Sequence, residues 1–243
     1  MKKIIDIIVS VIYMTYFTIL LFVFHPIQII AFRLFGYNAH AKSVNCLNGF
    51  IVYGWYLTFS SIKFKVSVPI PTDRPLLFIA NHQSTFDIPG LIWFLRKYHP
   101  VFVSKKELAK GVPSISYNLR HSGAALIDRK DTKQAVSEIL KLGTNMREKP
   151  WNVAIYPEGT RSRTGEMKPF AVGGVAALLK KCPDALIVPV AVENLSKFNP
   201  KGYWLTAFSK LSWTSLAPID PRNLTPEEVV AQAEAAIKAK IMA

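Results

Sequence analysis

The sequence predicts an α/β fold: a mixed, largely parallel sheet flanked by helices and preceded by an N-terminal membrane-embedded helical hairpin. From residue 64 onward, short apolar runs of strand length alternate with longer segments of helical periodicity, as in a sheet covered by helices. Before that point, two long uncharged apolar segments follow each other, which is typical of helices in a bilayer. We therefore expect a hairpin at residues 1–63 and an α/β domain at residues 64–243.

The hairpin is predicted by the uncharged runs at residues 7–24 and 44–62. As a helix, the first run would be about 27 Å long, just short of a hydrocarbon core of about 30 Å. Pro26 is expected to interrupt this helix, and the apolar sequence continues to Gly36. Aromatic residues that suit a membrane interface are Tyr13, Tyr16, Phe17, Trp55, Tyr56 and Phe59. The hairpin either crosses the bilayer twice or lies in one leaflet.

Basic residues flank the hairpin, with Lys2 and Lys3 before it and Lys63 and Lys65 after it. Because positive charge favours the cytoplasmic side, we expect the α/β domain on the cytoplasmic face, in a bacterium that of the inner membrane. Two other interpretations are a secretory signal peptide and a pair of buried helices in a soluble core. The signal peptide is disfavoured because the apolar run is too long.

The domain shows strand-like and helix-like segments in alternation. Strands are expected at residues 76–80, 101–104, 124–127, 153–156, 187–192 and 203–208. Helices are expected at residues 88–98, 132–147, 173–181 and 229–241. The last of these follows Thr225-Pro226-Glu227-Glu228, which is a capping signature.

Composition limits the function. The net charge is +14, of which +11 lies after residue 62, so the domain attracts phosphate groups of nucleic acid, anionic lipid or an acidic substrate. A nucleic-acid binder is disfavoured because no zinc-finger spacing, basic helix or RNA-binding aromatic pattern occurs. Hydride and phosphoryl transfer are disfavoured because their glycine-rich motifs do not occur, and the scattered histidines predict no metal site. Cys46 and Cys182 are expected to be buried thiols.

The central stretch is Asn81-His82-Gln83-Ser84-Thr85-Phe86-Asp87, between the first predicted strand and helix of the domain. On a straight helix, side chains five residues apart point about 140° apart, so His82 and Asp87 meet only across a turn. A carboxylate held against one imidazole nitrogen fixes the tautomer and leaves the other nitrogen free to accept a proton. The pair predicts a general base, with a polar loop residue and a helix cap as the alternative.

Polar residues also follow other predicted strands. Arg129 follows the strand at 124–127. It would share a sheet edge with His82 if the two strands are parallel neighbours. The strand at 153–156 is followed by Glu158, Gly159, Thr160, Arg161, Ser162 and Arg163. Arg161 offers the planar fork that matches phosphate, and Gly159 lets backbone N–H groups approach a ligand closely. Arg163 is expected to be a solvated surface cation, and Lys105 is a further basic candidate.

These segments together resemble the glycerolipid acyltransferase family, whose best-known members are 1-acylglycerol-3-phosphate acyltransferases (lysophosphatidic acid acyltransferases). The similarity runs over four ordered blocks between about residues 76 and 192. In this sequence they are Asn81-His82 with Asp87, Gly123–Arg129, Tyr156–Ser162, and Val188–Val192. Residues 111–117 depart from an aromatic-rich segment with glycine that many members have, which leaves the details of acceptor and acyl-chain binding open.

The resemblance implies an O-acyltransferase that makes phosphatidic acid from 1-acylglycerol-3-phosphate in phospholipid biosynthesis. The acyl donor would be a thioester, acyl-CoA or acyl carrier protein, acting as a co-substrate, with no bound cofactor and no metal. His82 would deprotonate the acceptor hydroxyl while Asp87 orients its ring. The partners implied are the phospholipid bilayer, the lysophospholipid acceptor and the acyl donor.

The remaining site residues have expected roles toward the substrates. Arg161 and Arg129, with Lys105 in support, would hold the acceptor phosphate. Gly159 and Thr160 are expected to offer backbone N–H groups to the oxyanion. Glu158 is expected either to bind acceptor hydroxyls or to hold an arginine.

Two rival functions remain open. The acceptor is alternatively another lysophospholipid, a lyso-ornithine lipid or glycerol-3-phosphate. The chain is alternatively an inactive scaffold that binds anionic lipid, although a binding module has no need of the base that His82 and Asp87 predict.

Overall fold

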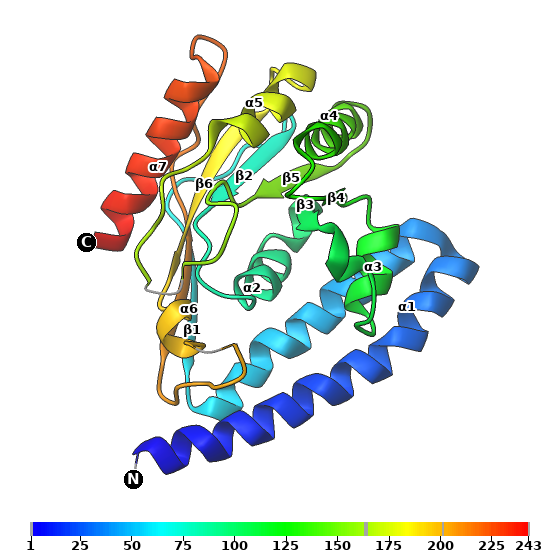
Figure 1. The fold of residues 1–243 in the computed structure, drawn as a ribbon, viewed down its shortest axis with the longest axis vertical. Coiled ribbons are helices and arrows are strands. Elements are labelled where there is room, and N and C mark those ends of the chain that lie inside the picture. Colours follow the sequence, from blue (N-terminus) through cyan, green and yellow to red (C-terminus); the bar gives the residue numbers. More distant parts are fainter. Residues whose placement is uncertain (1, 163–164, 201, 243) are drawn as a thin grey trace.

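The structure, a computed structural model, describes residues 2–162, 165–200 and 202–242. Its α/β domain contains a seven-stranded sheet in the order β1-β7-β6-β2-β5-β3-β4. Figure 1 shows the sheet between two helical layers, with the long hairpin α1 along the lower side of the molecule. The predicted fold class is confirmed.

The strands are β1 (Ser61–Val66), β2 (Leu76–Ala80), β3 (Pro100–Lys105), β4 (Ala125–Ile127), β5 (Asn152–Ile155), β6 (Leu186–Glu193) and β7 (Lys210–Ser215). The α-helices are α1 (Lys2–Gly54), α2 (Asp87–Phe94), α3 (Ile115–His121), α4 (Thr132–Glu148), α5 (Val172–Lys181), α6 (Leu195–Phe198) and α7 (Pro226–Met242). Short 3-10 helices are η1 (Trp55–Thr58), η2 (Arg96–Tyr98) and η3 (Lys106–Ala109).

Strand β2 lies at the centre of the sheet and is buried along its whole length. Its alternate side chains enter two separate cores, as the two-residue period of a strand requires. Leu76 and Phe78 pack in the core with α1 and α2, whereas Leu77 and Ile79 pack with α4, α5 and α7. Burial on both faces explains why β2 is a continuous apolar run.

The pairing of the strands determines where the polar segments meet. Strand β2 is parallel to both β5 and β6, and β3 is parallel to β5 and β4. The carboxyl ends of these strands therefore lie at one edge of the sheet, and the loops that follow them share that edge. Of the pairs of neighbouring strands in the described part of the chain, only β6–β7 is antiparallel.

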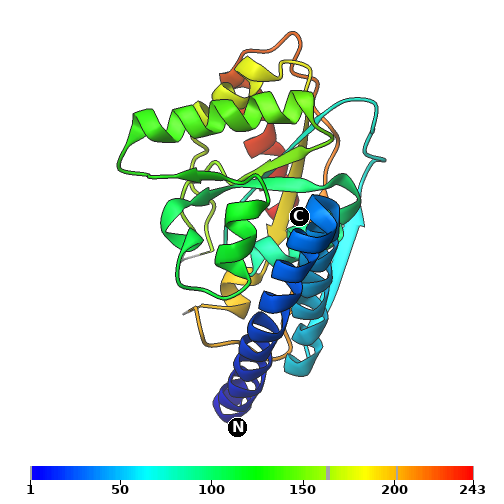
Figure 2. The ribbon, with the colours of Figure 1, turned by 90° about the vertical axis from the view of Figure 1, so that its right-hand side faces the viewer.

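Helix α1 is a hairpin whose two arms meet at Gly36, where φ is +76° (Figure 2). A left-handed backbone suits glycine, so the chain reverses there. The prediction that Pro26 interrupts the first arm is wrong, because the helix continues through it. Proline removes only its own N–H bond to the carbonyl of Phe22, a residue that is itself exposed.

The hairpin packs against the α/β domain along its whole length. In the first arm, the hydroxyl of Ser10 accepts from the N–H of Leu205, and near the turn the Tyr37 hydroxyl donates to the carbonyl of Ser122. After the second arm, Trp55 stacks on Trp213 of β7 with ring centroids 5.5 Å apart. The arms and the sheet therefore share one hydrophobic core.

Some predicted interface residues lie in this shared core instead. Tyr13 and Trp55 are fully buried, while Tyr56 and Phe59 are exposed. The expectation of two buried thiols is also wrong for one of them, since Cys46 is exposed and Cys182 is buried.

Residues 203–208 do not form the predicted strand. In this segment, Ser10 and Asp6 of the hairpin accept from the N–H groups of Leu205 and Ala207. Because the backbone is paired with side chains of α1, it is not available for a ladder, and the strand β7 begins at Lys210.

Two further elements have bounds that the sequence did not indicate. Strand β1 pairs in parallel with β7 and crosses the boundary expected between residues 63 and 64. The predicted helix at 88–98 is divided into α2 and the 3-10 helix η2.

Candidate active site

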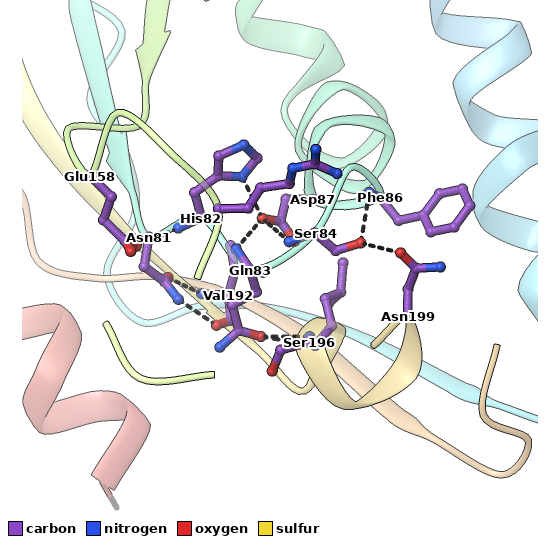
Figure 3. Close-up of polar contacts among 12 residues, drawn as sticks. Asn81, His82, Gln83, Ser84, Phe86, Asp87, Glu158, Val192, Ser196 and Asn199 are labelled. Atoms are coloured by element: carbon purple, nitrogen blue, oxygen red, sulfur yellow. Dashed lines mark hydrogen bonds and ion pairs between the residues drawn. The ribbon is translucent and has the colours of Figure 1, made fainter. Parts of the chain in front are cut away.

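The turn between β2 and α2 brings His82 and Asp87 together. The Nδ1 atom of His82 lies 2.8 Å from Oδ2 of Asp87, across a turn that ends where α2 begins (Figure 3). The same oxygen accepts the backbone N–H groups of Gln83 at 2.5 Å and Ser84 at 2.9 Å. Asp87 is fully buried. Three donors on one buried oxygen hold the carboxylate in place, and the carboxylate in turn orients the ring.

The other imidazole nitrogen, Nε2, has no hydrogen-bond partner among the described residues. The His82 side chain is 12% exposed, so it is partly accessible from the surface. A neutral ring with Nδ1–H directed at Asp87 carries its lone pair on Nε2. The arrangement can therefore accept a proton from a group that approaches Nε2.

Neighbouring side chains of the same stretch attach it to the end of β6. The amide of Asn81 both accepts from the N–H of Val192 at 2.7 Å and donates to its carbonyl at 2.8 Å. The Oε1 atom of Gln83 accepts from the N–H of Leu195 at 2.9 Å. These residues are buried and position the turn that carries His82, a role that their places in the sequence did not indicate.

Tyr156 packs flat on the imidazole of His82, with ring centroids 4.3 Å apart and planes 24° apart. Burial raises the pKa of the Tyr156 hydroxyl well above its usual value, and the charge of Asp87 adds to the effect. Tyr156 therefore stays neutral and limits the ring to one orientation. Its place in the sequence indicated no role for this residue beyond membership of the block Tyr156–Ser162.

The loop after β5 holds the backbone of His82 on both sides. Oε1 of Glu158 accepts the His82 N–H at 2.7 Å, and the N–H of Ser162 donates to the His82 carbonyl at 2.8 Å. The other oxygen of Glu158 accepts from the N–H of Lys168 at 3.1 Å. Burial raises the pKa of Glu158, partly offset by these two backbone hydrogen bonds.

Gly159, Thr160 and Arg161 lie at the tip of this loop. Gly159 has a φ of +66° and open space where a Cβ would be, but its N–H donates to the carbonyl of Tyr156 at 3.0 Å. The hydroxyl of Thr160 accepts from Nζ of Lys168 at 2.8 Å. Arg161 is exposed, and Lys168 adds a second cation that sequence reasoning missed. Arg163 lies outside the described residues.

Lys105 and Arg129 share the edge with His82 but are more distant. Strand β3 is two positions from β2 and β4 is three, or about 10 and 14 Å at a spacing of about 4.8 Å per strand. The condition that the strands of His82 and Arg129 be neighbours is therefore not met. Lys105 pairs with Glu107 at 3.1 Å, and Arg129 is exposed.

An apolar cavity of about 330 Å³ lies beside this turn, between the hairpin and the α/β domain. Thr85 and Phe86 line it next to the His82 turn, and Thr85 is exposed. Ser114, just before α3, and Ile115, its first residue, also line the cavity. Residues 111–117, where the sequence departs from the family pattern, therefore help to form its wall. In the described part of the chain, no cluster of three or more His, Cys, Asp or Glu residues could hold a metal ion.

The segments that form this site also occur in a known protein family. A family model described as Acyltransferase matches residues 61–193, more than half of the chain, and spans all four segments of the site. The chain belongs to this acyltransferase family. The resemblance inferred from the sequence blocks is thereby confirmed.

Individual relatives agree. The 1-acyl-sn-glycerol-3-phosphate acyltransferase alpha of Mus musculus is 26% identical over 198 residues, which are 80% of this chain and 67% of that protein. The 1-acyl-sn-glycerol-3-phosphate acyltransferase of Helicobacter pylori strain J99 is 36% identical over 130 residues, 51% of this chain and 52% of that protein. The chain thus spans between about half and two thirds of the length of these relatives.

A solved structure has the same fold. The crystal structure of the 1-acyl-sn-glycerophosphate (LPA) acyltransferase from Thermotoga maritima has a TM-score of 0.81 and 24% sequence identity. The match covers 99% of this chain and 96% of that one, so it extends over the hairpin as well as the acyltransferase domain.

Proposed function

We propose that this acyltransferase transfers an acyl chain from a thioester to the free hydroxyl of 1-acylglycerol-3-phosphate, forming phosphatidic acid. The observation that carries the proposal is the His82–Asp87 pair, in which Nε2 of His82 is unpaired among the described residues. The backbone of His82 is hydrogen-bonded to the loop that bears Arg161. The names of the relatives support this acceptor.

His82 acts as the general base in this proposal. Its Nε2 accepts the proton of the acceptor hydroxyl as the hydroxyl oxygen attacks the thioester carbonyl. Asp87 stabilises the imidazolium that forms. When the tetrahedral intermediate collapses, the carbon–sulfur bond breaks and the imidazolium returns its proton to the leaving thiolate. No protein nucleophile is required, since the donor is already activated.

Arg161 binds the acceptor phosphate, with Lys168 beside it. Both cations belong to the loop whose backbone is bonded to His82, so the distance from phosphate to base is restricted. A phosphate held at a fixed distance places the acceptor hydroxyl near Nε2. Lys105 and Arg129 contribute from positions further along the same edge, where they attract the acidic headgroups of both substrates.

The oxyanion needs a donor, and the Gly159 N–H is already bonded to the Tyr156 carbonyl. Of the two groups expected from the sequence, the Thr160 N–H is therefore the one that we assign. Glu158 supports the site by holding the His82 N–H and does not contact an arginine through any described hydrogen bond. The donor, acyl-CoA or acyl carrier protein, is a co-substrate and no bound cofactor takes part.

The hairpin attaches the enzyme to one leaflet of a membrane. Residues Lys2–Thr58 are long and apolar enough to cross a bilayer, and many apolar side chains of the first arm are exposed. The first arm contacts the α/β domain at Ser10 and again, near the turn, at Tyr37. The length of helix that extends away from the domain is therefore too short to span about 30 Å of hydrocarbon. We therefore favour the half-inserted arrangement, with the domain on the cytoplasmic face, over two crossings.

The test is an acyl-transfer assay with the full-length chain in phospholipid vesicles. Lysophosphatidic acid, another lysophospholipid, a lyso-ornithine lipid and glycerol-3-phosphate compete as acceptors, each with acyl-CoA and acyl carrier protein donors. We expect phosphatidic acid as the main product. Preference for another acceptor would replace the substrate assignment, and no transfer with any acceptor would favour a lipid-binding scaffold.

A further inference from the structure

Two buried polar side chains line the apolar cavity without a hydrogen bond. Gln28 of the first arm is 0% exposed and His40 of the second arm is 1% exposed. Both amide atoms of Gln28 and both ring nitrogens of His40 lack a partner among the described residues, and both residues line the cavity. Buried polar groups in native proteins are normally hydrogen-bonded, so these atoms require a partner that comes from the cavity.

Two other buried polar side chains of the same wall, Asn48 and Ser114, have hydrogen-bond partners within the chain. The Asn48 side chain donates to the carbonyl of Val44 at 2.7 Å. The Ser114 hydroxyl donates to the carbonyl of Leu21 at 2.8 Å. Gln28 and His40 therefore differ from Asn48 and Ser114, because their buried polar atoms have no partner among the described residues.

The open groups lie far from the end of the cavity beside His82. Phe17 lines the cavity near Phe86, with ring centroids 5.8 Å apart, and Phe86 belongs to the turn that bears the base. From Phe17 to Gln28 the first arm rises about 16 Å, at 1.5 Å per residue. His40 lies opposite Phe32, one helical turn beyond Gln28, with ring centroids 5.6 Å apart. Near the reaction the wall is formed by aromatic side chains and Thr85, whereas the buried polar atoms without partners lie at its distal end.

We infer that this cavity takes the transferred acyl chain and selects chains with a hydroxyl or another oxygen in their distal half, bound by Gln28 and His40. The inference rests on the proposed function, which places the thioester carbonyl at His82. The Gln28 amide offers N–H donors and an acceptor oxygen, and a neutral His40 ring offers one donor and one acceptor, so either can pair with a hydroxyl. An unsubstituted chain that enters the cavity displaces water from these atoms and leaves them unpaired, which disfavours it.

The test compares donors of equal chain length in the full-length enzyme. Coenzyme A thioesters of an unsubstituted chain, a chain hydroxylated near the thioester and a chain hydroxylated in its distal half compete for lysophosphatidic acid. We expect kcat/KM for the distal hydroxyl to exceed that for the unsubstituted chain at least about ten-fold, because a site that binds a hydroxyl rejects the analogue without it. The hydroxyl near the thioester should bring no such gain.

Two variants identify the residues responsible. Gln28→Met and His40→Phe keep the side-chain volume but remove the open polar atoms, so each should reduce the preference and raise kcat/KM for the unsubstituted donor. The matched control Phe17→Leu changes the apolar wall near the reaction and should alter both donors by the same factor. Equal rates for the donors in the wild type, or a preference that both variants retain, would overturn the inference.

A binding measurement separates this inference from the proposed reaction. The His82→Ala variant, which cannot turn over, is titrated by calorimetry with free fatty acids that have or lack the distal hydroxyl. The hydroxylated acid should bind more tightly than the acid without the hydroxyl, and the difference should be lost in the double variant His82→Ala with Gln28→Met. That result supports the inference even if the acceptor assignment fails. Equal binding overturns it even if phosphatidic acid is the product.

Discussion

The backbone N–H of His82 donates to Oε1 of Glu158 at 2.7 Å, and this bond joins two segments that are 76 residues apart in the chain. Together with the bond from the Ser162 N–H to the His82 carbonyl, it attaches His82 to the loop that bears Arg161. The proposed proton acceptor and the proposed phosphate-binding cation are therefore parts of one hydrogen-bonded unit.

Glu158→Gln should change how stability depends on pH. Burial raises the pKa of Glu158, so the folded state binds its proton more tightly than the unfolded state does. This contribution is complete below the unfolded pKa of about 4.3 and is lost as pH rises through the folded value. The melting temperature of the wild type minus that of Glu158→Gln should therefore be smaller at pH 7.5 than at pH 4. An equal difference in melting temperature at the two pH values would contradict a raised pKa of Glu158 in the folded state.

Arg161→Ala should weaken acceptor binding. Loss of a charge-assisted bond to phosphate costs about 1.5–3 kcal/mol, so the KM for lysophosphatidic acid should rise at least about ten-fold while kcat changes less. Arg161→Lys should recover only part of the loss, because lysine lacks the planar fork. Arg147→Ala, an exposed arginine of α4, is the control. An unchanged acceptor KM in Arg161→Ala would remove Arg161 from the phosphate site.

Asp87→Asn should lower kcat without a matching change in the acceptor KM. The amide keeps an oxygen for the Gln83 and Ser84 N–H groups but no longer stabilises the imidazolium of His82. A decrease of at least about a hundred-fold is expected. The exposed Asp73 provides the control substitution Asp73→Asn. Wild-type turnover in Asp87→Asn would show that the carboxylate only caps the helix.

Charges on the exposed face of the hairpin should release the enzyme from vesicles. Ile19 and Phe22 are 56% and 64% exposed on the first arm, and each apolar side chain of this size contributes about 1.5–3 kcal/mol when buried. Ile19→Glu with Phe22→Glu should lower the vesicle partition constant at least about ten-fold in a sedimentation assay. Val136→Glu, on α4 across the sheet, is the matched control. Equal partition of all variants would refute the membrane-bound face.

Surface substitutions are preferable to deletion of the hairpin. Tyr13 and Trp55 are fully buried in the core that also contains Phe78 and Trp213 of the sheet. Removing the hairpin would expose this core, so a loss of activity after deletion would not distinguish misfolding from release. The substituted side chains of Ile19 and Phe22 lie outside the core.

Much of the fold follows from local sequence signals. The buried strand β2 is a continuous apolar run, and α4 has its apolar residues at helical spacing, so both were predictable within a residue or so. Strand β7 was not, because the aromatic segment before it bonds to Asp6 and Ser10, nearly 200 residues earlier. Short-range patterns contain no information about such a pairing.

The site was predictable to a similar degree. The five-residue spacing of His82 and Asp87 requires a turn, and the structure has that turn. The stacking of Tyr156 on His82, the place of Lys168 and the strand order that separates Arg129 from His82 depend on tertiary arrangement. The open pair Gln28 and His40 is likewise visible only once the two arms are placed against the domain.

The general base is tested most directly by the rate of phosphatidic acid formation in His82→Ala at saturating lysophosphatidic acid and acyl donor. Far-ultraviolet circular dichroism and vesicle binding establish that the variant is folded and attached to the membrane. We predict a decrease in kcat of at least about 10²–10⁴-fold with both of these properties unchanged. A folded, membrane-bound His82→Ala protein that transfers acyl chains at close to the wild-type rate would contradict the mechanism.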